Sequence, residues 1–283
     1  MAEIAIGQAT VDDVAAIASR RRCDPVAMAI ALECAERETA WAARDDGDVV
    51  GVCLAHDSGE ERYVGDLFVE ASYRGQGVGG SLLDAALGNA GGVRSALFES
   101  GDPASLALVL RRGLVPRATV ARFAGAIPRE AGLLAMAAGD YRFDVEKLDH
   151  AARAYAVGDL DAATRGSARL DDHERFARDA QGFGFVLADE FVGYAYVRAD
   201  GRVGPVAAAS PAYVVQIFAY ALVATQRTFG ATWCSALVPA CNARLSRAAL
   251  RAGLRIEETL TLAGDVTPPP DLSCYAGFHR LLF

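Results

Sequence analysis

The sequence predicts an α/β protein of the mixed-sheet, α+β kind, built from two consecutive copies of one domain. The first observation is length, because 283 residues exceed the ~250 at which single hydrophobic cores usually stop growing. The second is a weak internal repeat with an offset near 140 residues, much longer than the period of a solenoid. The third is a strand, a glycine-dense turn and a helix start within residues 66–83.

The repeat rests on three short phrases, each of which contains a glycine. They are Val50-Gly51-Val52 with Val192-Gly193-Tyr194, Val64-Gly65 with Val203-Gly204, and Arg112-Gly113-Leu114 with Ala252-Gly253-Leu254. Their offsets are 142, 139 and 140 residues, so insertions of a few residues separate the copies. We expect a first domain over residues 1–130, a linker over 131–141 and a second domain over 142–283.

The first copy alternates strands and helices. A strand over residues 3–7 precedes a helical region that begins after Thr10, a good N-cap, and continues to about residue 40. Residues 40–43 and 49–55 predict a hairpin, because Asp45-Asp46-Gly47-Asp48 separates two apolar runs. The remaining elements are a strand over 62–69, a helix over 77–89, a strand over 93–99, a helix over 103–112 closed by Gly113, and a strand over 117–125.

The second copy restarts the plan at Arg142. Helices are expected within residues 144–180, a hairpin over 184–197 and a strand over 202–208. Ser210 then fits an N-cap with Pro211 at the first helical position. No glycine-rich turn stands at this point, so we expect a phosphate-bearing ligand to bind the first copy alone.

The turn in the first copy predicts an anion-binding cradle. The first N–H groups of a helix have no intrahelical partner, so they converge at the positive end of the helix dipole. Gly75, Gly77, Gly79 and Gly80 allow the main chain to approach phosphates closely and to adopt left-handed dihedrals. A pyrophosphate fits such a loop.

Two phosphate-binding patterns compete for this loop. Gly75, Gly77 and Gly80 satisfy G-x-G-x-x-G, which would indicate a dinucleotide-binding oxidoreductase, but there the first glycine follows its strand almost directly. Here residues 70–74 intervene. The pattern Arg/Gln-x-x-Gly-x-Gly/Ala is filled at every position by Arg74-Gly75-Gln76-Gly77-Val78-Gly79. This stretch resembles the pyrophosphate loop of the GNAT superfamily of acyl-CoA N-acyltransferases.

The resemblance covers residues 1 to about 128, and the second copy resembles the degenerate C-terminal domains of tandem GNAT proteins. It implies acetyl-CoA as co-substrate, with the pantetheine arm on the backbone of Leu67, Phe68 and Val69. One N–H group of that strand would polarise the thioester carbonyl. The pyrophosphate would lie on the loop residues Arg74, Gly75, Gln76, Gly77, Val78, Gly79, Gly80 and Ser81.

The implied activity is transfer of an acetyl group to a primary amine of a small molecule, by direct attack in a ternary complex. An alkylammonium has a pKa near ~10, so a base must take its proton. Asp66 is the candidate base, with a structural carboxylate as the other interpretation, and Glu99 is the reserve candidate. The family's general-acid tyrosine is Val109 here, which keeps a non-catalytic acyl-CoA sensor or scaffold open as an alternative.

Composition limits the partners. A formal net charge of −8 argues against nucleic acid, which requires a basic surface. No stretch approaches the ~18 apolar residues of a membrane span, and the first residues lack the features of a signal peptide, so we expect a cytoplasmic protein without a membrane partner. Six cysteines without a C-x-x-C pair and four scattered histidines predict no metal site. The oligomeric state stays open.

Overall fold

A computed structural model describes residues 4–59, 61–88, 92–129, 132–133, 136, 141–149, 151–265 and 271–283. The chain forms two compact units. The first comprises Met1–Arg117, Leu262–Val266 and Arg280–Leu282, and the second comprises Ala118–Thr261, Thr267–His279 and Phe283. Both units combine helices with β-sheet, which confirms the predicted fold class. Most of the expected linker over 131–141 lies outside the described residues, and the expected domain limits stay a prediction.

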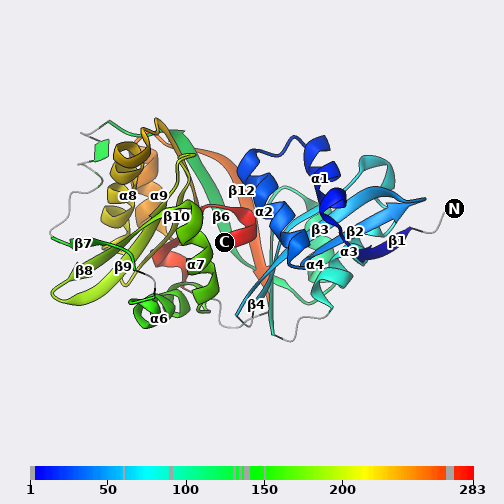
Figure 1. Ribbon diagram of the computed structural model, residues 1–283, viewed down its shortest axis with the longest axis horizontal. Coiled ribbons are helices and arrows are strands. Elements are labelled where there is room, and N and C mark those ends of the chain that lie inside the picture. Colours follow the sequence, from blue (N-terminus) through cyan, green and yellow to red (C-terminus); the bar gives the residue numbers. More distant parts are fainter. Residues whose placement is uncertain are drawn as a thin grey trace. The chain divides into compact units, whose positions relative to one another are not determined.

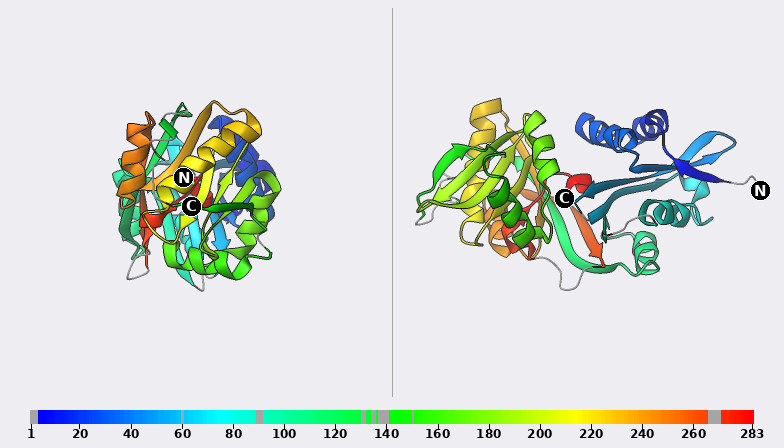
Figure 2. Two further views of the ribbon diagram at one scale, coloured as in Figure 1. Left: turned by 90° about the vertical axis from the view of Figure 1, so that its left-hand side faces the viewer. Right: turned by 60° about the horizontal axis from the view of Figure 1, so that its bottom comes forward.

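The first unit has strands in the order β1-β2-β3-β4-β5, in which β4 and β5 are parallel and the others antiparallel. Figure 2 shows α1 and α2 on one face of this sheet and α3 and α4 on the other. The elements are β1 (Ala5–Gln8), α1 (Val11–Arg20), α2 (Pro25–Glu36), β2 (Ala40–Asp45), β3 (Asp48–Ser58), β4 (Glu61–Val69), η1 (Ala71–Tyr73), α3 (Val78–Leu87), β5 (Val93–Glu99) and α4 (Pro103–Leu110).

Local sequence explains the ends and the packing of these helices. Thr10 caps α1 in a capping box with Asp13, as predicted, which satisfies two of the first backbone N–H groups. Asp24 caps α2 ahead of Pro25. Leu82 and Leu83 of α3 are almost completely buried against the sheet, so the amphipathic pattern of this helix positions the loop that precedes it.

Strand β4 carries an irregularity at Gly65. In the pairing of β3 with β4, Leu54 lies opposite Asp66 and Ala55 lies opposite Val64, which leaves Gly65 as the extra residue of a bulge. The parallel pairing of β4 with β5 ends at Val64 and Ala96, although both strands continue beyond these residues. Residues 67–69 therefore have no β5 partner in that ladder, and the two strands diverge beyond the bulge.

The second unit repeats the plan with helices on both sides of β8, β9 and β10, as Figure 1 shows. One sheet has the order β13-β10-β9-β8-β7, and β11 pairs with β6. The elements are β6 (Val115–Ala126), β7 (Asp144–Lys147), α6 (Ala154–Arg165), α7 (Leu170–Asp179), β8 (Gln181–Leu187), β9 (Glu190–Val197), β10 (Val203–Ala208), α8 (Val214–Phe229), β11 (Trp233–Pro239), α9 (Ala243–Arg251), β12 (Arg255–Gly264), η2 (Leu272–Cys274) and β13 (Tyr275–Ala276). A last short helix, η3 (Arg280–Leu282), belongs to the first unit.

The final strands of the two copies are exchanged. Strand β6, the predicted last strand of the first copy, pairs through most of its length with β11 of the second unit. Conversely, the end of β12 belongs to the first unit. There Asp265 bonds to Arg94 of β5 through its backbone and through an ion pair of 2.8 Å. Each unit is therefore completed by chain from the other half of the sequence.

The structure supports the internal repeat at matched glycines. Gly51 of β3 and Gly193 of β9 both lie where a strand packs closely against a helix. An added Cβ would lie 3.1 Å from Leu82 of α3 at Gly51 and 2.4 Å from Ile217 of α8 at Gly193. Gly113 and Gly253 both have a left-handed φ after α4 and α9. The two copies therefore share their close contacts as well as their element order.

Two predictions about the second copy were wrong. Residues 144–147, expected to begin a helix, form strand β7 because they pair with β8. Helix α8 begins at Val214, not beside Pro211. The oxygens of Ser210 accept hydrogen bonds from the N–H groups of Ala212, Tyr213 and Val214, which makes a turn before the helix.

A buried polar network lies inside the second unit. Asp161 receives Arg169 Nε at 3.1 Å, contacts His173 Nε2 at 2.9 Å and accepts a hydrogen bond from Tyr194. His173 Nδ1 lies 3.0 Å from the hydroxyl of Tyr196. Burial alone would raise the pKa of Asp161, but the charge of Arg169 and the hydrogen bond with His173 lower it to about 2. The network joins α6 and α7 to β9.

Candidate active site

The predicted cradle stands at the start of α3. Gly77 is the N-cap with φ +89° and Gly75 has φ +78°, so both glycines adopt the left-handed conformation that other residues avoid. The side chains of the described residues provide no cap for this helix. The intrahelical bonds begin with Ser81 N–H to Gly77 C=O at 3.0 Å. The preceding N–H groups of the first turn therefore remain available to an anion.

Side chains brace the loop without filling it. Arg74 Nε donates to the carbonyl of Val69 at 2.9 Å, and Gln76 donates to the carbonyl of Ser72 at 2.8 Å. Asp102, the N-cap of α4, has a lowered pKa because Ser105 hydrogen-bonds to it and Arg74 adds a favourable charge. The loop is exposed from residue 74 to residue 77. It thus combines open main-chain donors with nearby cations, Arg74 and Arg112, of which Arg112 donates to the carbonyl of Gly80 at 2.5 Å.

The two faces of β4 have different surroundings. Leu67 and Val69 point toward α3, because a Cβ at Gly79 would lie 3.9 and 3.6 Å from their side chains. Asp66 and Phe68 point to the opposite face, where both contact Arg21. The diverging strand therefore separates a side facing the cradle helix from a side facing α1.

Asp66, the predicted base, is held in an ion pair with Arg21. Arg21 Nη2 lies 3.1 Å from Asp66 Oδ1, and its other terminal nitrogen binds Oδ2. The guanidinium carbon also lies 5.0 Å from the ring centroid of Phe68. Burial alone would lower the pKa of Arg21, but the charge and hydrogen bonds of Asp66 outweigh it and raise that pKa. Sequence reasoning missed Arg21, although the run Arg20-Arg21-Arg22 at the end of α1 could have indicated it.

The other predicted positions have simpler surroundings. Glu99 is exposed at the end of β5, and its charge contributes to the raised pKa of Arg21. Val109 is 3% exposed and packs in the core of the first unit, so the position of the family's tyrosine serves packing here. The described residues contain no group of three or more potential metal ligands. None of the described helices has the length and apolar character needed to cross a bilayer.

The C-terminal residues cover the bulge of β4. A Cβ on Gly65 would lie 2.6 Å from both the carbonyl oxygen of Arg280 and the Cα of Leu281. Arg280 also acts electrostatically on Cys23, the thiol that follows α1. The side of β4 that faces α1 is thus bounded by a segment more than two hundred residues away in sequence, which no local pattern could reveal.

In the second unit, the chain itself occupies the corresponding strand edge. Tyr275 and Ala276 of β13 pair with Ala207 and Val206, the counterparts of Phe68 and Leu67. Gly277 then exchanges two backbone hydrogen bonds of 2.8 Å with Leu237 of β11. The edge that would bind a pantetheine arm is therefore closed by the C-terminal strand.

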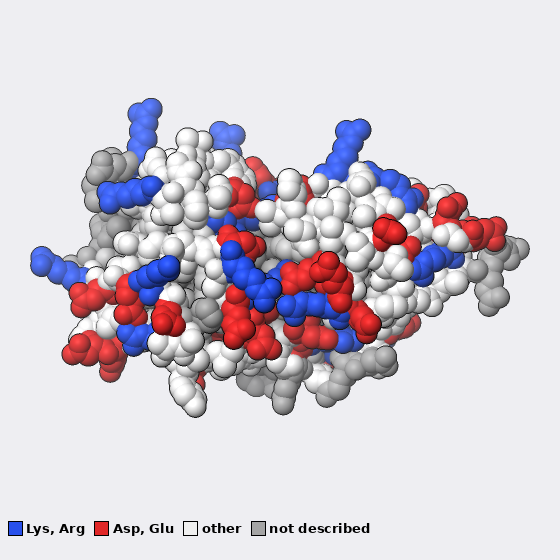
Figure 3. Space-filling model, in the orientation of Figure 1, with Lys and Arg blue, Asp and Glu red and all other residues white. Residues whose placement is uncertain are grey.

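The face drawn in Figure 3 carries Lys and Arg side chains interspersed with Asp and Glu. Elsewhere in the described chain, oppositely charged side chains form ion pairs such as Arg62–Asp57 at 2.6 Å and Arg153–Glu146 at 2.8 Å. Exposed pairs of this kind add little stability and are typical of a solvated surface.

Comparison with known proteins identifies a GNAT domain within the first unit. Residues 36–108 match the family model of the acetyltransferase (GNAT) domain, which includes β4, the loop and α3. None of the curated proteins matches the sequence. A proposed acetyltransferase from Pyrococcus horikoshii shares 16% identity over 99% of this chain and 96% of its own, with a TM-score of 0.75.

Two further solved structures have the same two-domain fold. A tandem GNAT protein from the clavulanic acid biosynthesis pathway shares 15% identity over 93% of this chain and 98% of its own, with a TM-score of 0.61. A GCN5-related N-acetyltransferase from Sphaerobacter thermophilus shares 15% identity over 96% of this chain and 98% of its own, with a TM-score of 0.61. At these identities the likeness concerns the fold. Together with the family model over residues 36–108, it shows that the chain contains an acetyltransferase (GNAT) domain and has the two-domain fold of a tandem GNAT protein.

Proposed function

We propose that the first unit transfers an acetyl group from acetyl-CoA to a primary amine of a small molecule, by direct attack within a ternary complex. The observation that carries this proposal is the combination of a diverging, bulged β4 with an open N–H cradle directly after it. The edge of β4 offers backbone hydrogen bonds to an amide-containing arm. The cradle offers hydrogen bonds to a pyrophosphate.

Each part of the donor has a place in this arrangement. The pyrophosphate would lie on the main chain of residues 74–81, and the pantetheine arm along Leu67, Phe68 and Val69 on the α3 side. A backbone N–H beside the bulge would polarise the thioester carbonyl, a type of contact worth roughly 3 kcal/mol in the transition state. The leaving thiolate requires no hydroxyl at Val109, since a thiol of pKa near ~8.5 is a tolerable leaving group.

The acceptor would enter on the α1 side, where Asp66 lies. An incoming ammonium can replace Arg21 as the partner of this carboxylate, so the acid exchanges one cation for another. Asp66 would then accept the ammonium proton, directly or through one water, before the neutral nitrogen attacks the thioester. The thioester C–S bond breaks, an amide C–N bond forms, and CoA leaves as the thiolate.

The test is release of free CoA thiol from acetyl-CoA in the presence of a panel of small primary amines. Turnover with at least one amine, lost on Asp66→Ala and retained on Glu99→Gln, supports the proposal. Tight binding of acetyl-CoA without turnover on any amine would identify a sensor or scaffold instead. Binding of NAD(P) with no stabilisation by CoA in a thermal-shift assay would indicate the dinucleotide alternative.

A further inference from the structure

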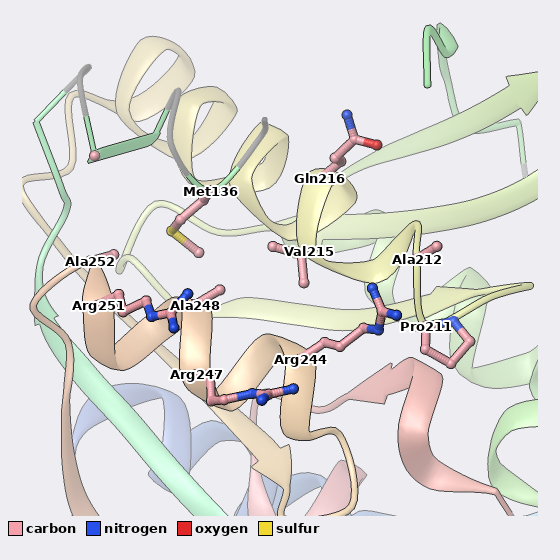
Figure 4. A pocket seen from close by; sticks show the side chains of 11 residues that line it. Met136, Pro211, Ala212, Val215, Gln216, Arg244, Arg247, Ala248, Arg251 and Ala252 are labelled. Atoms are coloured by element: carbon pink, nitrogen blue, oxygen red, sulfur yellow. The ribbon is translucent and has the colours of Figure 1, made fainter. Parts of the chain in front are cut away.

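A cavity of about 560 Å³ lies in the second unit, between the start of α8 and one face of α9. Its volume is within the range of small-molecule sites. Figure 4 shows Arg244, Arg247 and Arg251 of α9 along one side of it, with Val215 of α8 and Met136 across from them. One side of the cavity is therefore basic and the opposite side is apolar.

The basic wall is unusual in this acidic chain. Helix α9 has the sequence ARLSRAALR, which contains three arginines and no acid. They are spaced three and four residues apart, so they share one face of the helix. Many of the chain's other arginines pair with carboxylates, as Arg21 does. In the described part of the chain, no carboxylate forms an ion pair with Arg244, Arg247 or Arg251, and Arg247 Nε donates only to Ala243 C=O at 3.2 Å.

The cavity is the second copy's counterpart of the space beside the cradle. Asn242 caps α9 as Asp102 caps α4, and α8 follows β10 as α3 follows β4. The main-chain donors differ, because the N–H groups of residues 212–214 already bond to Ser210. An anion in this cavity would therefore be held by guanidinium groups, each of which can donate two parallel hydrogen bonds to a phosphate.

We propose that this cavity binds a small organic phosphate of about the size of a nucleoside diphosphate. Its phosphoryl groups would lie on Arg244, Arg247 and Arg251, and its ring or apolar part would pack on Met136, Val215 and Ala252. A bound thioester arm is excluded, since β13 occupies the strand edge that would accept one. The site is a binding site and carries no group-transfer step.

The experiment is a calorimetric titration of the full chain with ADP, inorganic pyrophosphate and adenosine, with CoA present at saturation to occupy the first unit. We expect ADP and pyrophosphate to bind, more weakly as salt is raised, and adenosine to bind far less. The double variant Arg247→Gln/Arg251→Gln should weaken ADP binding at least about tenfold, because two charged donors are lost.

Arg255→Gln is the control for loss of positive charge, because it removes one positive charge where the double variant removes two, at an exposed position of the same unit that does not line the cavity. It should leave ADP binding unchanged, and all variants should keep the thermal unfolding curve of the parent. Equal ADP affinity in the double variant would overturn the proposal. So would failure of both ADP and pyrophosphate to bind. None of these outcomes depends on turnover in the first unit.

Discussion

Arg21 and Asp66 connect the end of α1 to the diverging part of β4 through both oxygens of the carboxylate. Their side chains are 26% and 13% exposed, so the pair lies partly out of water and is screened less than a surface pair. Phe68 supports the guanidinium from the same face of the strand. In the proposed reaction, an incoming acceptor would therefore meet this ion pair before the thioester.

Asp66→Asn should lower kcat/KM for the best amine by about 10²-fold to 10⁴-fold, because the amide cannot accept the ammonium proton. The affinity for acetyl-CoA should stay the same, since Asp66 points away from the α3 side of β4. Steady-state rates and CoA titration separate the two effects. A variant that retains full turnover would leave Asp66 with a structural role only.

Arg21→Gln tests whether the pair itself governs acceptor choice. Removing the guanidinium leaves Asp66 free to bind an ammonium without competition, so KM for a cationic amine should fall while the rate constant changes less. The cost in folding stability should be about 1 kcal/mol, measured by urea unfolding. An unchanged KM across the amine panel would show that acceptors do not displace Arg21.

Gly77→Ala should weaken CoA binding about tenfold, because its Cβ would project into open space at the N-cap of α3, where the pyrophosphate is proposed to lie. The left-handed φ of +89° also costs about 1 kcal/mol of stability in any residue with a Cβ. Gly113→Ala is the control for that strain, since its φ is +77° and its Cβ would likewise meet nothing within 4 Å. Both variants should lose similar stability in thermal unfolding, and only Gly77→Ala should lose CoA affinity.

Gly65→Ala should destabilise the first unit by about 1–3 kcal/mol, the usual cost of forcing an extra methyl group into packed structure. The new Cβ would meet the backbone of Arg280 and Leu281 at 2.6 Å, and backbone cannot swing aside as a long side chain can. Gly101→Ala is the matched control, because a Cβ there would contact nothing within 4 Å. Equal urea midpoints for the two variants would contradict the close cover of the bulge by the C-terminal residues.

Local patterns predicted much of the first unit. The strand expected over residues 93–99 is β5, and Thr10 caps α1 with Asp13 as its partner. The loop glycines at 75 and 77 adopt the left-handed backbone that motivated the cradle. These features depend on neighbours within a few residues, so the sequence carries their physical cause directly.

Long-range choices could not be predicted in the same way. The exchange of β6 and β12 between the units depends on which sheet edge each strand pairs with. The residues of the two strands do not distinguish one edge from the other. Strand β7 forms from Asp144-Val145-Glu146-Lys147 because β8 offers a partner, although the segment has little strand character by itself. Arg21 and Asp66 are 45 residues apart in sequence, and only the fold brings Asp66, the candidate base, into contact with the guanidinium of Arg21.

The buried network of the second unit predicts a pH-dependent stability. Burial lowers the pKa of His173 from its ordinary value of 6.5, and the hydrogen bond with Asp161 only partly opposes it. Below pH 6.5 the unfolded chain therefore binds a proton that the folded chain refuses, so stability falls as the pH falls from 7 toward 5, by up to about 1.4 kcal/mol per pH unit. Asp161 does not contribute in that window, since its carboxylate titrates between 3.8 in the unfolded chain and about 2 in the folded one.

His173→Gln should remove that slope, because a glutamine does not titrate, and should lower the stability at pH 7 through the lost contacts with Asp161 and Tyr196. Tyr196→Phe is the control, since it deletes one contact of His173 and keeps the titrating ring. Urea unfolding at pH 7 and pH 5 measures the difference for each protein. The parent and Tyr196→Phe should lose stability at pH 5 relative to His173→Gln, and parallel losses in all three would show that His173 is not the group that takes up the proton.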